Sequence, residues 1–302
     1  MSSEREALEA TIDQAPDDAS RYAVLGDYCL QLGDPRGELI SLQLTDRSSR
    51  EKREREAVLL HTRGIRIAQT QRAQWRWGFV HTLFFGLVQH AGWEERRDDW
   101  TTTLLAPALS HPSCRFLREL VIDAGPGDDA LRFLSAAHPE RSRGTRHLEA
   151  LTLTCNELDL ANVGAGLSQL VKLAVYAQLI VPAEVKLPRL QELSLPVDAM
   201  TVHGLSLVLG ALPSLKSLTL SSLESFDREA LFPVTQLRGL QKLTLRADKT
   251  TRSAVEAIAD SPLLESLVTL DVSRSGMTEE AAHRLLALKF ARLDTLTLGD
   301  AP

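Results

Sequence analysis

The stretch LEALTLTCN, residues 148–156, places leucines at its first, fourth and sixth positions and an asparagine at its ninth. Similar spacing recurs along the chain, in copies that begin at Val80 (a weaker match), Leu117, Leu170, Leu190, Leu215, Leu240, Leu267 and Leu293. From Leu148 onward, successive starts are 22, 20, 25, 25, 27 and 26 residues apart. A near-constant period of this kind indicates a repeat architecture.

Each copy predicts one short strand, called a repeat strand below. In LKSLTLSS, Leu218 and Leu220 alternate with Thr219, so the two leucines point to one face of the strand and the threonine to the other. One strand cannot bury its leucine face alone. Stacking the strands side by side joins these faces into a continuous core, in which each repeat contacts mainly its neighbours. We therefore predict an α/β fold with a parallel sheet.

A parallel sheet needs a crossover after every strand, and the connecting segments suit helices. Apolar residues fall at helical spacing in VHGLSLVLGAL from Val202, and a further helix is expected in RSAVEAIAD from Arg252. In MTEEAAHRLLAL, Thr278 suits the N-cap position. Prolines precede several repeat strands, where a helix must have ended, at Pro112, Pro188, Pro213 and Pro262.

With this spacing the chain resembles the leucine-rich repeat family in its helix-bearing, ribonuclease-inhibitor-like form. The resemblance implies a solenoid of about eight or nine repeats over residues 73–302, with the sheet on the concave face and helices on the convex face. Asn156 keeps the family's usual asparagine after the strand, whereas most other repeats carry a different residue there.

The segment before the repeats is charged and lacks their spacing. In LGDPRGELISLQ, residues 32–43, Gly33 suits the end of one helix, Asp34 an N-cap and Pro35 the first position of the next helix. This stretch resembles a bacterial repeat-companion domain, through Gly33, Asp34, Pro35, Arg36, Gly37, Glu38, Leu42 and Gln43. The resemblance implies association with repeats, and we expect residues 1–72 to form a small all-α domain that caps the solenoid.

We expect a long helix over residues 49–75, whose alternating charges favour a solvated face over a basic docking surface. The four tryptophans, Trp75, Trp77, Trp93 and Trp100, lie where the two segments meet. Solenoid ends need caps, so we interpret these rings as sealing the N-terminal helices onto the first repeat strand. An exposed aromatic anchor for a partner is the alternative.

Composition excludes several classes of function. The formal net charge is -6, which gives no general attraction for nucleic acid or anionic membranes. No apolar stretch reaches the roughly 20 residues of a membrane helix, and no secretory signal pattern opens the chain. The 3 cysteines are scattered, so no disulfide framework is expected. We therefore predict a cytoplasmic protein without nucleic-acid or membrane partners.

No catalytic motif emerges from the sequence. The chain lacks a GxSxG nucleophile elbow, an HExxH zinc motif and a GxxxxGK[ST] phosphate loop. The 8 histidines show no paired ligand spacing. We therefore predict a non-enzymatic protein with no metal and no cofactor.

The face of the sheet opposite the leucines is the predicted binding surface. Its middle column is rich in threonine, which strand propensity also explains, so the charged and aromatic positions are more informative. The candidate partner-binding residues are Glu119, Asp123, Lys172, Tyr176, Glu192, Lys242, Arg246, Asp271 and Arg274. Their mixed charges suit a protein partner better than a polyanion.

The sequence thus favours a scaffold that binds a protein partner on the concave face. A regulator of an enzyme or small GTPase is the alternative, in which Arg246 or Arg274 would act on the partner's site. An enzyme with its own pocket and a purely structural spacer remain further alternatives. The last repeat strand is followed by little sequence, so we also expect its edge, at Leu296 and Leu298, to be covered by self-association or a partner.

Overall fold

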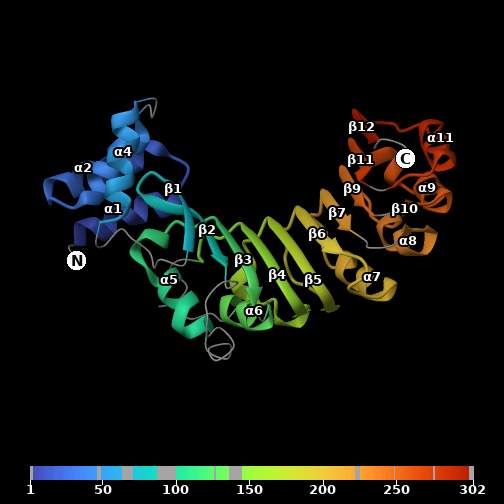
Figure 1. Cartoon of the computed structure of the whole chain (residues 1–302), viewed down its shortest axis with the longest axis horizontal. Helices are drawn as coiled ribbons and strands as arrows, with labels where there is room; N and C mark the ends of the chain where they lie inside the picture. The colour runs from blue at the N-terminus through green and yellow to red at the C-terminus, as the bar shows by residue number, and fades with distance from the viewer. Residues whose placement is uncertain are drawn as a thin grey trace. The chain divides into compact units, whose positions relative to one another are not determined.

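The computed structural model describes residues 3–45, 49–62, 71–86, 100–125, 127–135, 145–221, 225–247, 249–274 and 276–298 (Figure 1). The chain divides into two compact units. Unit 1 comprises Met1–Val121 and His138–Leu148, and unit 2 comprises Ile122–Ala137 and Glu149–Pro302. Strand β3, Glu119–Gly125, contributes residues to both.

Unit 1 opens with helices and continues with a hairpin. Its helices are α1 (Ser3–Gln14), α2 (Ala19–Gln31), α3 (Pro35–Leu44), α4 (Arg50–Leu60) and α5 (Ala106–Ser110). Around α5 lie a π-helical turn, Thr101–Leu105, and a 3₁₀ turn, Pro112–Cys114. The hairpin strands are β1 (Gln71–Arg76) and β2 (Phe79–Gly86). The weaker repeat copy at Val80 therefore forms a strand.

The turn between α2 and α3 follows the sequence prediction. Gly33 adopts a φ of +68°, which favours glycine. The Asp34 carboxylate accepts a hydrogen bond from the backbone N–H of Arg36 at 2.9 Å, and Pro35 is the first residue of α3. The predicted N-cap and first helical position are therefore confirmed.

The β1–β2 hairpin corrects one prediction. The helix expected over residues 49–75 ends at Leu60, and Gln71–Arg76 is a strand antiparallel to β2. Trp77 and Gly78 form the two-residue turn with φ values of 51° and 80°. Positive φ at both positions is typical of a type I′ turn, whose twist matches that of paired strands. Pairing with the apolar strand β2 thus decides the structure of this polar segment.

The described tryptophans pack inside unit 1, as interpreted from the sequence. Trp77 lies 4.9 Å from the Tyr22 ring, measured between centroids, and Trp100 is 1% exposed against Phe85. Trp75 packs against Leu39 and Leu59 of α3 and α4. Trp93 lies outside the described residues. Trp75 and Trp77 join the N-terminal helices to the hairpin, so the packing interpretation is confirmed for these two, whereas Trp100 packs against strand β2.

Unit 2 contains a parallel sheet built from the repeat strands. The strands lie in the order β4 (Ala150–Asp159), β5 (Lys172–Val181), β6 (Glu192–Pro196), β7 (Ser217–Ser221), β9 (Lys242–Arg246), β11 (Thr269–Arg274) and β12 (Thr295–Leu298). A separate short parallel pair consists of β8 (Ser225–Phe226) and β10 (Lys249–Thr250). The predicted side-by-side parallel stacking of the repeats is therefore confirmed within this unit.

The leucines of successive strands stand in register. Leu193 pairs with Leu218, Leu218 with Leu243, Leu243 with Leu270 and Leu270 with Leu296. All except Leu296, which is half-buried, are at most 3% exposed. Removing such side chains from water supplies the main stabilisation of the unit.

Helices connect the strands and cover the leucine face (Figure 1). They are α6 (Gly127–Ser135), α7 (Val202–Gly210), α8 (Arg228–Thr235), α9 (Arg252–Ala259), α10 (Leu263–Ser266) and α11 (Glu279–Leu286). Two 3₁₀ turns, Leu160–Asn162 and Ala165–Leu167, take the place of a helix after β4. Helix α7 contacts α8, α8 contacts α9, and α9 contacts α11.

One capping arrangement recurs in four of these helices. The side chain of the N-cap residue accepts a hydrogen bond from the backbone N–H three residues later. The N-cap residues are Thr201 of α7, Asp227 of α8, Thr251 of α9 and Thr278 of α11. The last of these confirms the predicted cap.

The fold is therefore α/β with a mainly parallel sheet, as the sequence predicts at that level. None of the described helices combines the length and the apolar composition that are needed to span a bilayer.

Candidate functional site

The face of the unit 2 sheet opposite the buried leucines, called the open face below, carries the candidate site. In β7, Leu218 and Leu220 are fully buried, whereas Ser217, Thr219 and Ser221 are partly exposed. The alternation follows from the two-residue period of a strand. Side chains between the leucines therefore remain accessible.

Strand pairing arranges the open-face residues in three rows. The first row runs through Lys172, Glu192, Ser217, Lys242 and Thr269. The second row runs through Ala174, Ser194, Thr219, Thr244 and Asp271. The third row includes Tyr176 of β5 and continues through Pro196, Ser221, Arg246 and Arg274.

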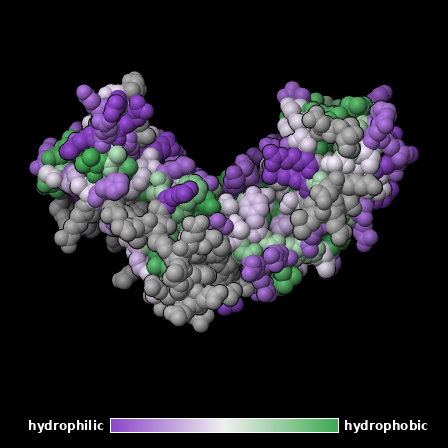
Figure 2. Space-filling view, viewed as in Figure 1, coloured by the Kyte–Doolittle hydropathy of each residue, from purple (hydrophilic) through white to green (hydrophobic). Residues whose placement is uncertain are grey.

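A groove of about 220 Å³ lies on these rows. Its floor includes the short side chains of Ala174, Ser194, Ser217 and Thr219. Lys172 and Tyr176 on β5 border one side, and Lys242 and Arg246 on β9 border the other. Figure 2 shows hydrophilic residues gathered over β7 and β9. Small residues between larger ones thus create a depression in an otherwise flat sheet.

Strand spacing sets the distance between the two strands that border the groove. Strands β5, β6, β7 and β9 are consecutive neighbours. Neighbouring strands are about 4.8 Å apart, so the backbones of β5 and β9 are separated by about 14 Å. That distance is close to the diameter of an α-helix with its side chains, about 10–12 Å, and exceeds the width of an extended strand.

Charges on the open face are unevenly paired. The Lys172 ammonium and the Glu192 carboxylate are 3.9 Å apart, and both side chains are about half exposed. Partial burial of Asp271 opposes its ionisation. Hydrogen bonds from Ser273, through its hydroxyl at 2.7 Å and its backbone N–H at 3.0 Å, outweigh that effect and lower the Asp271 pKa. The charges of Arg246 and Lys242 act in the same direction.

A bulge in β11 brings Arg274 into the third row. Asp271 pairs with Thr244, but the next pair is Arg274 with Arg246, so β11 has one extra residue at this point. The backbone N–H of Ala247 donates to the Arg274 carbonyl at 2.8 Å, which fixes the register. Arg274, a candidate from the sequence, therefore lies directly opposite Arg246.

The structure brings most of the predicted site residues together. Lys172, Tyr176, Glu192, Lys242 and Arg246 line the groove. Asp271 and Arg274 lie on β11, which pairs with β9. Asp123 is exposed on β3 in unit 2, outside the groove lining, whereas Glu119 belongs to unit 1 and accepts a hydrogen bond from the Thr82 hydroxyl at 3.1 Å.

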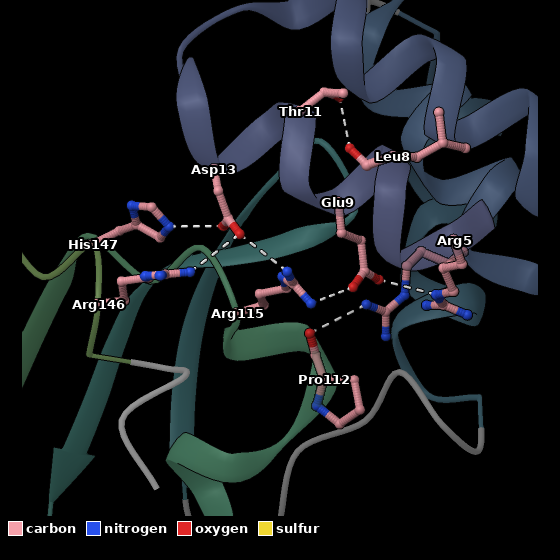
Figure 3. Close-up of polar contacts among 10 residues, drawn as sticks. Arg5, Leu8, Glu9, Thr11, Asp13, Pro112, Arg115, Arg146 and His147 are labelled. Atoms are coloured by element: carbon pink, nitrogen blue, oxygen red, sulfur yellow. Dashed lines mark hydrogen bonds and ion pairs between the residues drawn. The ribbon is translucent and has the colours of Figure 1, made fainter. Parts of the chain in front are cut away.

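A second polar cluster lies in unit 1 and was missed from the sequence (Figure 3). Asp13 of α1 contacts His147 at 2.9 Å, Arg115 at 3.1 Å and Arg146 at 3.5 Å. One helical turn away, Glu9 pairs with Arg115 and with Arg5. Except for the pair of Glu9 with Arg5, more than a hundred residues separate these partners, so no local sequence pattern predicts the cluster. It ties α1 to two distant segments of unit 1.

Burial and neighbouring charges shift the pKa values of several ionisable groups in unit 1. Burial opposes ionisation of Asp13, but hydrogen bonds and charge from His147 and Arg115 outweigh it and lower the pKa of that carboxyl. Burial raises the pKa of Cys114 to about 12 and also raises the pKa of Cys29. These thiols are protonated at neutral pH and therefore poor nucleophiles. Within the described ranges, no group of His, Cys, Asp and Glu is arranged to hold a metal ion.

Comparison with known proteins does not indicate a function. No protein-family model matches the chain, and no curated protein matches it significantly. Function is therefore inferred from the geometry of the open face.

Proposed function

We propose that the chain is a leucine-rich repeat protein of the ribonuclease-inhibitor-like form that binds a protein partner on the open face of unit 2. The family assignment is supported by leucine rows in register and by helices α7, α8, α9 and α11 after successive strands. In such a solenoid the open face is the concave one, and it binds without covalent chemistry.

The observation that carries this proposal is the groove between β5 and β9. Tyr176 is 47% exposed beside a floor of small residues. Exposed aromatic side chains next to a depression are typical anchors of protein interfaces, because they bury much area at little entropic cost.

A cytoplasmic location is part of the proposal. It is supported by Cys29 and Cys114, which are both buried and free. Proteins of oxidising compartments tend to pair their cysteines, whereas cytoplasmic proteins keep them reduced.

Two double variants test the assignment of the open face. Lys172→Ala with Tyr176→Ala removes one border of the groove, and Lys242→Ala with Arg246→Ala removes the other. We expect both variants to lose proteins that the wild-type chain captures reproducibly from its native cell extract. The far-ultraviolet circular dichroism spectrum should stay unchanged, because these side chains are exposed.

A control matched to the second variant removes the same two positive charges elsewhere in unit 2. Arg189→Ala with Arg228→Ala removes two exposed arginines that lie outside the groove. This control should capture the same proteins as the wild type. Equal capture by wild-type chain and both groove variants would show that binding occurs elsewhere.

A further inference from the structure

Two arginines stand opposite each other on the open face. Arg246 of β9 and Arg274 of β11 are register partners, and both are exposed. Residues directly opposite each other project to the same face of a sheet, with their Cβ atoms about 5 Å apart. Like charges in that position repel and destabilise the sheet, so the pair is unfavourable unless an anion lies against it.

The structure neutralises the positive charge of the arginine pair only in part. Asp271 lies in the neighbouring row, but its Oδ1 atom accepts two hydrogen bonds from Ser273. Among the described residues, no carboxylate lies within 4.0 Å of either arginine's guanidinium. The N–H donors of the two guanidinium groups are therefore not engaged by any described carboxylate.

The surrounding face is positive although the chain is acidic. The formal net charge of the chain is -6. In the three rows from β5 to β11, however, four cations (Lys172, Lys242, Arg246 and Arg274) stand against two carboxylates (Glu192 and Asp271). A local excess of positive charge attracts anionic groups and repels other cationic surfaces.

We infer that the groove binds an acidic segment of a protein partner, whose carboxylates lie against Arg246 and Arg274. This inference rests on the proposed function and specifies the chemistry of the partner. Planar guanidinium groups bind carboxylates through paired N–H···O bonds, which are stronger than neutral hydrogen bonds. Small apolar residues of the segment would cover the floor beside Tyr176, and the separation of about 14 Å between the backbones of β5 and β9 is comparable with the diameter of one helix.

The same face disfavours nucleic acid. Glu192 and Asp271 stand among the cations and would repel a continuous phosphate backbone. Single strands are usually held by successive aromatic rings, and Tyr176 is the one aromatic residue among the described residues that line the groove. Spaced carboxylates, separated by apolar residues, fit the alternation of charge and short side chains better.

Fluorescence anisotropy with labelled synthetic peptides tests the inference. The probe is a helix-forming peptide of glutamate, leucine and alanine, and two companions replace every glutamate by glutamine or by lysine. We expect the full-length protein to bind the glutamate peptide roughly tenfold more tightly than the glutamine peptide. Added salt should reduce that difference.

Variants of the arginine pair make the test specific. Arg246→Gln with Arg274→Gln should abolish the preference for glutamate, whereas the matched control Arg189→Gln with Arg228→Gln should retain it. Arg246→Glu with Arg274→Glu should reverse the preference in favour of the lysine peptide. Equal affinity of the wild type for the glutamate and glutamine peptides would overturn the inference, as would equally tight binding of single-stranded DNA at the same salt concentration.

Thermal stability separates a binding role from a structural one. If the pair exists for binding, Arg274→Gln removes repulsion, so its Tm should equal or exceed that of the wild type. A lower Tm would point to a structural role and count against the inference. A third outcome separates the two proposals: the protein binds the glutamate and glutamine peptides equally, but the groove variants still lose captured proteins. The open face would then remain the binding surface, and the inference of an acidic partner would be wrong.

Discussion

Asp13 shows how one partly buried carboxylate can connect distant parts of a chain. Its two oxygens contact His147, Arg115 and Arg146, which lie more than a hundred residues away in the sequence. The side chain is only 16% exposed, so these contacts are shielded from water more than a surface ion pair is. The carboxylate therefore depends on its partners for the polar contacts that water would otherwise provide.

We expect Asp13→Asn to destabilise unit 1 by about 1–3 kcal/mol at neutral pH, because it leaves buried donors poorly paired. The folded-state pKa of Asp13 is lowered, so its contribution is present above the ordinary pKa of about 4 and is lost as pH falls below it. The difference between wild type and variant should therefore shrink in acid. Urea unfolding followed by tryptophan fluorescence measures it, since all 4 tryptophans belong to unit 1.

Asp17→Asn is the matched control for that measurement. The Asp17 side chain is 72% exposed and pairs with Arg76 at 3.4 Å and Arg118 at 3.1 Å. Exposed pairs contribute little, so the control should unfold close to the wild type at every pH. A loss as large as that of Asp13→Asn would mean that burial does not explain the effect.

Asp271 offers a prediction of the opposite kind, in which a charge is removed to strengthen binding. Its lowered pKa keeps it ionised at neutral pH, where it offsets part of the charge of Arg246 and Lys242. Asp271→Asn should therefore bind the glutamate peptide about two- to threefold more tightly, a change typical of a partly screened charge. The same anisotropy titration measures it, and weaker binding would contradict the electrostatic account.

At the scale of elements, the contact between α2 and α3 depends on glycine. A Cβ atom at Gly37 would lie 2.5 Å from the backbone nitrogen of Leu30 and 2.6 Å from the carbonyl oxygen of Gly26. Both are backbone atoms, so the helices themselves would have to separate. The residue type at this position therefore sets how closely the two helices approach.

Gly37→Ala should accordingly destabilise unit 1 by about 1–3 kcal/mol or more, the usual range for overpacking. Chemical unfolding of the variant, followed by tryptophan fluorescence, gives the value. Gly86→Ala is the control, because Gly86 also belongs to unit 1 and a Cβ atom there meets nothing within 4 Å. A Gly37 variant as stable as the Gly86 variant would show that the helices can move apart at little cost.

The elements differ in how far the sequence predicts them. The repeat strands were predictable because Leu218 and Leu220 carry the strand period locally, and Thr278 marks a helix start through its own side chain. The strand Gln71–Arg76 was not predictable from the sequence, because its polar residues form a strand only through pairing with β2 across the turn at Trp77 and Gly78. Tertiary pairing overrides local propensity in such cases.

At the scale of the whole molecule, the two units should respond separately to a core change. Leu218 is fully buried in the middle of the unit 2 sheet, between Leu193 and Leu243. Leu218→Ala should cost unit 2 about 2–5 kcal/mol, the usual range for a truncated buried leucine. Thermal unfolding followed by circular dichroism should move to lower temperature, whereas the tryptophan signal of unit 1 should move less.

Ser217→Ala is the control for this prediction, since Ser217 is the adjacent open-face residue of the same strand. It should leave both signals close to those of the wild type. Identical shifts of the two signals in Leu218→Ala would show that the units unfold as one.

The candidate site also shows the limit of sequence reasoning. Spacing from the leucines was enough to place Lys172, Tyr176 and Lys242 on one face. The position of Arg274 beside Arg246 required the bulge, which exists only in the pairing of β9 with β11. The ion cluster around Asp13 likewise depends on long-range contacts that no periodic pattern encodes.

The alignment of Ser217 with both Glu192 and Lys242 has an evolutionary consequence. Deleting residues 217–241 at the level of the gene would make β6 and β9 neighbours, and these two strands already share a register through β7. The rows of buried leucines would then remain continuous. Duplicating the same segment would insert one more strand between the cationic borders. Recombination would thus widen or narrow the groove in steps of about 4.8 Å. The cationic residues at its borders would stay the same, while the size of the ligand that fits would change.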